Sequence, residues 1–311
     1  MITVGICTQN PRPDYLQRVV DALQRQTVSL DQWELLLIDN ASQTRVAEQI
    51  DLSWHPHARH LREETPGVTH ARLRGIEEAL GEIVVWLDDD NVPADDFLAT
   101  GIYIGVLCPQ LGAWGGQVIP EFEVDPPEKL KPYLRSYLMI REFTEARWSN
   151  LCNYHVTAPG GAGMWLRKEV AQAYREKIRS DRRSLAYSRR ENLIVCGEDS
   201  DMALCALPLG MGTGIFPDLR ITHLIPSTRL TEEFFLRAAF GGGYSFTLLD
   251  YLHGVRTSRP KSNRALQALR SLRRAMKSRF SWQLERERRR GEDIAWKQIR
   301  EWQKCQSEDR K

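Results

Sequence analysis

The chain has 311 residues and a formal net charge of +2, and 42% of its residues are hydrophobic. These values are ordinary for a soluble globular protein with a sizeable core, in one large domain or two smaller ones. The six cysteines have neither a C-x-x-C pair nor a framework spacing, which indicates a reducing compartment. The sequence opens directly on a strand-like segment, residues 2–7, so we expect no signal peptide and a cytoplasmic protein.

Strand-like and helix-like segments alternate through the first part of the chain. The strand-like runs cover residues 2–7, 33–38, 58–61 and 83–87, and the helix-like segments cover 14–26 and 69–80. Runs that are apolar on both faces and separated by helices predict an α/β fold, with a parallel sheet covered on both sides.

Polar side chains follow three of these predicted strands. Residues 8–10 read Thr-Gln-Asn, residues 39–42 read Asp-Asn-Ala-Ser, and residues 88–91 read Asp-Asp-Asp-Asn. In parallel sheets of this kind, ligands bind beyond the carboxyl ends of the strands. The three strand ends therefore predict one site that hydrogen-bonds a nucleotide.

Three adjacent carboxylates, Asp88, Asp89 and Asp90, follow the fourth strand-like run. They repel one another unless a positive group joins them, and at such a strand end the usual partner is a divalent cation that carries phosphate oxygens. On an extended chain Asp88 and Asp90 share a face and Asp89 points away, which favours a division of roles. The alternative is an acidic turn that caps a helix starting near Pro93, with Asp90 or Asn91 as its N-cap.

Residues 97–120 contain no charged side chain, but Pro109 and Gly112 interrupt the run. We therefore predict a buried helix followed by a strand, and no transmembrane helix. Further along, residues 160–163 read Gly-Gly-Ala-Gly before another strand-like segment. This pattern indicates either a close approach of the backbone to a ligand or acceptor, or a simple glycine turn.

Several short motifs, in their order and spacing, resemble glycosyltransferase family 2, whose members are inverting, metal-dependent transferases with the GT-A fold. The similar segments are 4–10, 37–42, 67–75, the DxD position at 87–90, 160–163 with Arg167, the Gly-Glu-Asp at 197–199, and His223. One position departs from the family pattern. Leu73 replaces the asparagine that usually follows Ala71 and Arg72, which removes a polar contact.

The resemblance implies a Rossmann-like nucleotide-binding sheet, mixed and mainly parallel, and a nucleotide-sugar donor with uridine as its base. Asp39 would accept the imino hydrogen of uracil, or it is a turn residue that caps the next helix. Thr8 and Asn10 would line the same pocket, and Asp89 would contact the ribose or the sugar. Arg72 would place positive charge near the diphosphate or hold the carboxylates, or it is a surface residue in a weak salt bridge.

The resemblance also implies that Asp90, with help from Asp88, binds Mn²⁺ or Mg²⁺ bridging the diphosphate, because a hard cation neutralises that leaving group. His223 would complete the metal shell through a ring nitrogen, or it is a structural histidine. Inversion requires a base opposite the leaving group, and the Glu-Asp motif implies that Asp199 is this base, with Glu198 orienting it or the acceptor. Alternatively, these two carboxylates only favour the N-terminus of the following helix.

We predict a catalytic domain over residues 1–230, with a nucleotide-sugar half at 1–120 and an acceptor half at 121–230. Residues 231–311 form a helical, basic extension. Its helix begins near Thr231, and we expect the three glycines at 241–243 to break it.

Basic residues dominate the chain after Arg256, and leucines and a methionine recur among them at helical spacing, at Leu266, Leu269, Leu272 and Met276. A basic amphipathic helix of this kind can lie on an anionic membrane surface, such as the inner face of the cell membrane, and would suit a lipid-linked acceptor. The alternatives are a helix docked by its leucine stripe or a coiled-coil contact between subunits of an oligomer. No nucleic-acid partner is expected, because no aromatic platform accompanies the charge.

The leading hypothesis is a glycosyltransferase of glycan or cell-envelope polysaccharide biosynthesis, with a glycan, a lipid-linked molecule or a small molecule as its acceptor. A nucleotidyltransferase acting on sugar phosphates is a second hypothesis, although it would normally show a glycine-rich basic loop after the first strand, which Thr8 to Pro11 is not. A non-catalytic nucleotide-sugar-binding protein is the third, and the joint presence of Asp88, Asp90 and Asp199 argues against it. The sequence identifies neither the sugar nor the acceptor.

Overall fold

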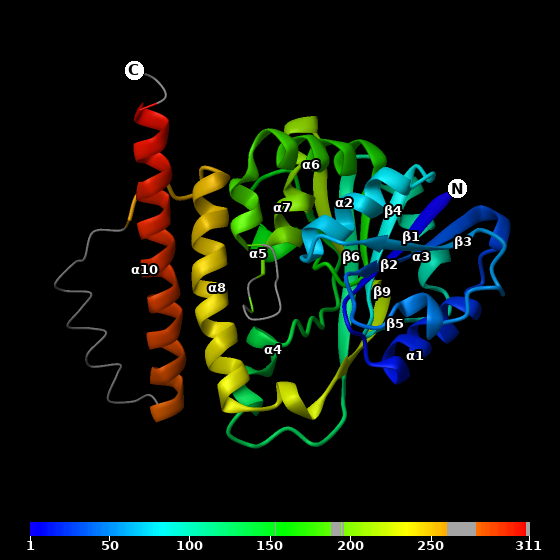
Figure 1. The fold of residues 1–311 in the computed structure, drawn as a ribbon, viewed down its shortest axis with the longest axis horizontal. Helices are drawn as coiled ribbons and strands as arrows, with labels where there is room; N and C mark the ends of the chain where they lie inside the picture. The colour runs from blue at the N-terminus through cyan, green and yellow to red at the C-terminus, as the bar shows by residue number, and fades with distance from the viewer. Residues whose placement is uncertain (153, 188–193, 195, 260–277, 309–311) are drawn as a thin grey trace. The chain divides into compact units, whose positions relative to one another are not determined.

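The computed structural model describes residues 1–152, 154–187, 194, 196–259 and 278–308. The chain divides into two compact units, one made of Met1–Ser188 and Glu198–Ser227 and the other of Arg189–Gly197 and Thr228–Lys311. The first unit holds the sheet and every predicted site residue. The second is built on two long helices (Figure 1).

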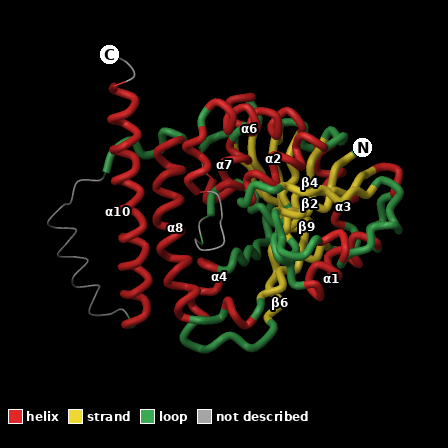
Figure 2. Tube along the Cα trace, in the orientation of Figure 1, coloured by secondary structure: helices red, strands yellow, loops and turns green. Residues whose placement is uncertain are grey.

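A single mixed sheet forms the centre of the first unit (Figure 2). Its strands are β1 (Ile2–Thr8), β2 (Trp33–Asn40), β3 (Ala58–Glu63), β4 (Ile83–Asp88), β5 (Asn91–Pro93), β6 (Leu111–Phe122), β7 (Arg147–Ser149), β8 (Met164–Arg167) and β9 (Gly212–Ile225). Neighbouring strands follow the order β3-β2-β1-β4-β8-β6-β9-β5, and β7 also pairs with β9. The predicted α/β fold is confirmed.

The direction of the strands changes within this sheet. Strands β3, β2, β1 and β4 are parallel, so their carboxyl ends meet at one edge. Strand β8 runs antiparallel between β4 and β6, and β6 and β9 are parallel again. The alternation of strand and helix in the first part of the sequence predicts the parallel half, as observed.

Helices cover both faces of the sheet (Figure 1). They are α1 (Pro13–Gln24), α2 (Val68–Glu78), α3 (Phe97–Leu107), α4 (Leu134–Tyr137), α5 (Tyr154–Thr157), α6 (Lys168–Ser180) and α7 (Glu198–Leu204). On one face α1 and α3 pack on the apolar side chains of β1, β2 and β4. On the other face α2 lies close to Trp86 of β4, because Gly5 and Gly75 leave room for its indole ring.

Two local predictions need correction. The helix and strand predicted over residues 97–120 are present as α3 and β6, but the helix is not fully buried, since Tyr103, Val106 and Leu107 are exposed. No helix starts at Pro93. Instead, the chain turns at residues 89–90 and continues as β5, which pairs with β9 and sets Asn91 opposite His223.

The second unit consists mainly of α8 (Glu232–Leu252) and α10 (Arg279–Glu308). These helices run side by side in the same direction (Figure 1), as the contact of Tyr251 with Trp302 near their ends illustrates. The predicted break at residues 241–243 is wrong, because α8 continues through the three glycines. A Cβ at Gly243 would lie 2.0 Å from the Arg288 carbonyl oxygen, and one at Gly291 would lie 2.1 Å from that of Phe240, so these glycines allow a close helix crossing.

The leucine stripe predicted between Leu266 and Met276 lies outside the described residues. Within the residues that the structure describes, no helix combines the length and the hydropathy needed to cross a bilayer.

Candidate active site

The three adjacent carboxylates after β4 face different partners. Asp88 ends the strand, and its Oδ1 lies 3.9 Å from Nη2 of Arg72 on α2. Asp89 and Asp90 form the turn into β5, so the chain is not extended there and the expected alternation of faces does not hold. Asp89 accepts a hydrogen bond from the Thr8 hydroxyl at the end of β1. The turn thus directs the three carboxylates towards different partners.

Asp90 points towards His223 of β9, with 3.6 Å between its Oδ2 and the histidine Nε2. The histidine Nδ1 lies 3.1 Å from the Leu138 carbonyl oxygen. A carbonyl oxygen only accepts, so Nδ1 donates the hydrogen of this contact, and Nε2 is the ring nitrogen that faces Asp90. One carboxylate oxygen and one imidazole nitrogen facing each other, both buried, are donors of the kind that Mn²⁺ accepts.

These donors do not form a complete metal site by themselves. Among the described residues, no group of three His, Cys, Asp or Glu side chains is arranged to hold a metal ion. Asp88 is paired with Arg72, and Asp90 with His223. Oxygens from a bound diphosphate would have to complete the coordination of a cation here.

The loops after β1 and β2 are locked together by hydrogen bonds. The Asn10 N–H donates to Ser42 Oγ at 2.8 Å, and the Gln43 N–H donates to Asn10 Oδ1 at 2.9 Å. Asn10 and Ala41 both have a positive φ, of 50° and 55°. Ala rarely adopts this backbone conformation, so the tertiary fold imposes it, as often happens in loops that bind ligands.

Asp39 is buried beneath these loops, and its carboxylate accepts three hydrogen bonds. It accepts the Ser42 N–H at 2.9 Å, the Val46 N–H at 3.3 Å and Nη1 of Arg62 at 2.7 Å. Burial acts to raise the pKa of Asp39, but these hydrogen bonds outweigh it and hold the pKa below its usual value. Asp39 therefore anchors the loop after β2, as the turn alternative predicted, and its contact with a base stays a prediction.

Arg72 is the most deeply buried cation of the site, with 3% of its surface exposed. Its Nη1 lies 3.9 Å from Glu198 Oε1 on α7, as far as Nη2 lies from Asp88. Burial acts to lower the pKa of Arg72, but the Glu198, Asp88 and Asp199 carboxylates outweigh it and raise the pKa above its usual value. The alternative that Arg72 lies on the surface is wrong.

Cys7 of β1 borders the same group of charges. Burial raises the pKa of its thiol to about 12, and the carboxylates of Asp88 and Asp89 act in the same direction. The nearby Arg72 acts to lower the pKa, but its effect is smaller than that of burial. A thiol in this condition stays protonated at neutral pH, so Cys7 acts as a packing residue.

Asp199 lies in the first turn of α7, at the helix N-terminus that the alternative interpretation named, and faces the glycine segment that precedes β8. The Gly161 N–H donates to its Oδ2 at 2.7 Å. Two residues further on, Asp201 has no exposed surface and pairs with Lys177 of α6. This ion pair attaches α7 to α6 and so fixes the helix that carries Asp199.

The structure thus brings together Asp88, Arg72, Glu198 and Asp199 in one charged cluster, with the Asp90–His223 pair and the Thr8–Asp89 contact at the same edge of the sheet. Asn10 and Asp39 lie in the neighbouring loops.

Two residues of this region, Arg62 and Arg141, carry no signal in a single sequence, whereas Gly161 lies in the predicted glycine segment. Arg62 covers Asp39, and Gly161 supports Asp199. Arg141 donates from Nη1 to the Ala158 carbonyl oxygen at 2.7 Å, and burial lowers its pKa although Asp199 nearby opposes the shift. Arg141 is thus a second, partly buried cation near Asp199. No motif surrounds Arg62 or Arg141, and only their strand pairings in the fold would have revealed them.

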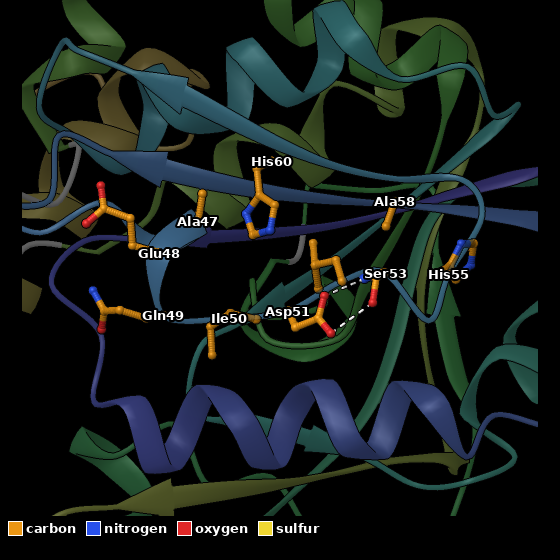
Figure 3. Close-up of a pocket in the computed structure, with 10 residues that line it drawn as sticks. Ala47, Glu48, Gln49, Ile50, Asp51, Ser53, His55, Ala58 and His60 are labelled. Carbon is orange, nitrogen blue, oxygen red and sulfur yellow. Dashed lines mark hydrogen bonds between the residues drawn. The ribbon is translucent and has the colours of Figure 1, made fainter.

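A separate hollow lies between the loop after β2 and strand β3 (Figure 3). Asp51 and Ser53 are hydrogen-bonded to each other on one side, and His60 of β3 lies on another. None of the residues that line it is a predicted site residue, so the hollow is not the predicted nucleotide site.

Solved structures of GT-A type share the fold of this mixed sheet. The mannosyltransferase PcManGT from Pyrobaculum calidifontis, in complex with GDP-Man and Mn²⁺, matches with a TM-score of 0.55 and 18% identity over 92% of this chain and 72% of that one. S. aureus TarS 1-349 in complex with UDP-GlcNAc matches with a TM-score of 0.52 and 15% identity over 77% of this chain and 64% of that one. At these identities, the likeness shows the fold alone.

Residues 3–102 match the model of glycosyl transferase family 2. Glycosyltransferase AglE of Haloferax volcanii is 30% identical over 90 residues, which are 28% of this chain and 30% of that protein. The glucosyl-dolichyl phosphate glucuronosyltransferase of the same organism is 30% identical over 69 residues, 22% of each chain. The similarity to glycosyltransferase family 2 thus lies in residues 3–102, and the matched part spans less than a third of the length of these relatives. The matched segment contains Asp39, Arg72 and the three carboxylates after β4.

Proposed function

We propose that this protein is a glycosyltransferase that moves a sugar from a nucleotide-diphospho-sugar to an acceptor hydroxyl with inversion at the anomeric carbon. The observation that supports it best is the charged cluster in which Arg72 lies between Asp88 at the end of β4 and Glu198 at the start of α7. It brings the DxD position and the Glu-Asp motif, 110 residues apart in the sequence, to one edge of the sheet.

The proposed metal is Mn²⁺ or Mg²⁺, held by Asp90 and His223, with Asp88 as a further ligand. Bound there, the cation would neutralise the diphosphate as it leaves. The fit rests on the facing carboxylate oxygen and imidazole nitrogen and on the contact of Nδ1 with the Leu138 carbonyl oxygen. PcManGT, which shares the fold, was solved with Mn²⁺.

The proposed base of the donor is uridine, in a pocket formed by Thr8, Asn10 and Asp39, with Asp89 directed towards the ribose or the sugar. The interlocked loops after β1 and β2 supply the rigid wall that such a pocket requires. TarS was solved with UDP-GlcNAc and PcManGT with GDP-Man, so a test must compare both bases.

In the proposed reaction, Asp199 accepts the proton of the acceptor hydroxyl. The acceptor oxygen forms a bond to the anomeric carbon, and the electron pair of the carbon–oxygen bond leaves with the nucleoside diphosphate. Arg72 keeps Asp88 and Glu198 in place during this displacement, and Glu198 orients the base or the acceptor. The backbone of Gly161 fixes one oxygen of Asp199.

The proposed acceptor is a glycan, a lipid-linked molecule or a small molecule. The basic segment after Arg256 is the proposed contact with an anionic membrane surface, which would suit a lipid-linked acceptor. Flotation with anionic vesicles of the whole chain and of a chain ending at Gly254 tests this contact. Equal flotation of the two would remove the membrane contact from the proposal and leave the transferase unaffected.

Thermal shift with UDP-glucose, UDP-GlcNAc and GDP-mannose, each with and without Mn²⁺, tests the donor. A shift that requires Mn²⁺ and is confined to one base is expected, and the absence of a shift with every nucleotide would remove the central claim. Release of nucleoside diphosphate from the stabilising donor then tests Asp199. Asp199→Asn should lower this rate by about 100-fold or more, the usual contribution of a positioned general base.

A further inference from the structure

The backbone of Gly161 lies where the end of β4 approaches the start of α7. Strand β8 pairs antiparallel with β4, with Met164 opposite Trp86. The Gly163 N–H donates to the Trp86 carbonyl oxygen at 2.9 Å. In this antiparallel register, the residues before Met164, including Gly161, lie beside and beyond Asp88, the last residue of β4.

The missing side chain of Gly161 leaves the space that the Arg72 guanidinium occupies. A Cβ built on Gly161 would lie 2.4 Å from Arg72 Nη2 and 3.3 Å from Asp199 Oδ2. A carbon atom does not lie 2.4 Å from a nitrogen atom to which it is not bonded, so an added methyl group would have to displace the guanidinium. The Arg72 side chain is 4% exposed and lies between Asp88 and Glu198, so it cannot move aside towards solvent.

The backbone of Gly161 also holds the carboxylate of Asp199. Its N–H donates to Oδ2 at 2.7 Å, a short hydrogen bond to a charged acceptor. A carboxylate with one oxygen bound in this way has a fixed rotation about its side chain. The Gly161 N–H does not bind its other oxygen, Oδ1.

We propose that Gly161 is a positioning residue, which sets the angle of Asp199 through its N–H and the place of Arg72 through its missing side chain, so that Oδ1 of Asp199 receives the proton. The inference rests on the proposed function of Asp199 as the base. The hydroxyl proton moves to Oδ1, the acceptor oxygen bonds to the anomeric carbon, and the nucleoside diphosphate leaves with the electron pair. Gly161 itself touches no reacting atom.

Nuclear magnetic resonance tests the hydrogen bond without any turnover. In protein labelled with ¹⁵N-glycine, the amide peak that Gly161→Ala removes is that of Gly161. Asp199→Asn should move this peak upfield, because an amide oxygen accepts a weaker hydrogen bond than a carboxylate. The peak of Gly160, assigned in the same way, should move less. Equal movement of the two peaks would overturn the assignment of the hydrogen bond.

Gly160→Ala is a matched control for the kinetic test. A Cβ at Gly160 would lie 2.3 Å from the terminal methyl group of Met139, which is the end of a flexible side chain and can move. With the donor that gives the thermal shift, Gly161→Ala should lower kcat for nucleoside diphosphate release by about 100-fold, the usual effect of a misplacement of about 1 Å. KM for the donor should change by less than about threefold, because the donor contacts remain, and Gly160→Ala should change neither value by more than that.

The clash with Arg72 is tested by combining substitutions. The ammonium group of lysine is smaller than the guanidinium of arginine, so lysine at residue 72 leaves room for a methyl group at residue 161. Adding Gly161→Ala to Arg72→Lys should therefore cost less than about threefold in kcat, against about 100-fold in the wild-type background.

The results separate the two proposals. If Asp199→Asn turns over the donor as fast as wild type, the proposed role of Asp199 is wrong. If Asp199→Asn is inactive but Gly161→Ala behaves like Gly160→Ala, the base remains and the positioning role of Gly161 is wrong. Equal costs of Gly161→Ala in the two Arg72 backgrounds would also overturn the positioning role.

Discussion

Removal of the Arg72 guanidinium should destabilise the first unit far more than the loss of a surface cation. Arg72→Met keeps most of the apolar stem and deletes the charge. The two ion pairs are 3.9 Å long, and at this distance unit charges attract by about 4 kcal/mol at an effective dielectric constant of 20. The side chain of Asp88 is 38% exposed, so water screens that pair to about 1 kcal/mol or less.

The pair with Glu198 determines the result, because the Glu198 side chain is only 9% exposed. Deleting one partner of a buried ion pair leaves the other charge without compensation and costs about 3–5 kcal/mol. We therefore expect Arg72→Met to lower the free energy of unfolding by about 3 kcal/mol. For a unit of this size, the midpoint of thermal unfolding should fall by roughly 6–12 °C.

Urea titration of the wild type and four variants measures this cost. Glu198→Gln removes the carboxylate charge that Arg72→Met leaves without a partner. The double variant should therefore lose about 1–2 kcal/mol less unfolding free energy than the sum of the losses of the two single variants. Arg18→Met is the matched surface control, since Arg18 and Glu121 pair at 2.6 Å with about half of each side chain exposed. It should cost less than about 1 kcal/mol. A cost of Arg72→Met as small as that of Arg18→Met, or a strictly additive double variant, would refute the reasoning.

Three further outcomes are expected. His55 is 3% exposed, and burial lowers its pKa to about 4, so as the pH falls the unfolded chain binds a proton at this residue before the folded chain does. The free energy of unfolding should therefore fall by about 3 kcal/mol between about pH 7 and pH 4, and urea titration of the wild type against His55→Asn measures this loss. Gly243→Ala should disrupt the crossing of α8 and α10 and lower their melting temperature, whereas Gly242→Ala, whose Cβ would lie 3.9 Å from its nearest neighbours, should leave it unchanged. His223→Gln should weaken Mn²⁺ binding by at least about tenfold, seen in the Mn²⁺ titration of the thermal shift, and an unchanged titration would exclude His223 as a ligand.

Features that depend on a short segment of sequence were predictable. The four parallel strands have runs of apolar residues, and their polar ends follow directly, so the position of the site at one edge of the sheet could be inferred. A helix that starts at the Glu-Asp motif was also predicted from the local pattern, and α7 starts at Glu198.

Features that depend on distant pairing were not predictable. The turn at Asp89 and Asp90 arises because β5 pairs with β9, which begins at residue 212, and no local signal distinguishes this turn from a helix cap. Asp39 is covered by Arg62 because β2 and β3 are parallel neighbours in a register that sets these two residues side by side. A sequence gives the type of each side chain at a strand end, but the strand pairing decides which charge meets which.

Glycine shows this dependence most clearly. The glycines at 241–243 were expected to end a helix because glycine has a low helix propensity, about 1 kcal/mol below alanine. The helix continues, since the space that Gly243 leaves is filled by the backbone of α10. At Gly161 the corresponding space is filled by the guanidinium of Arg72. In both cases the side chain is missing because another group needs the space, so the role of a glycine follows from the group next to it in the fold and not from its neighbours in the sequence.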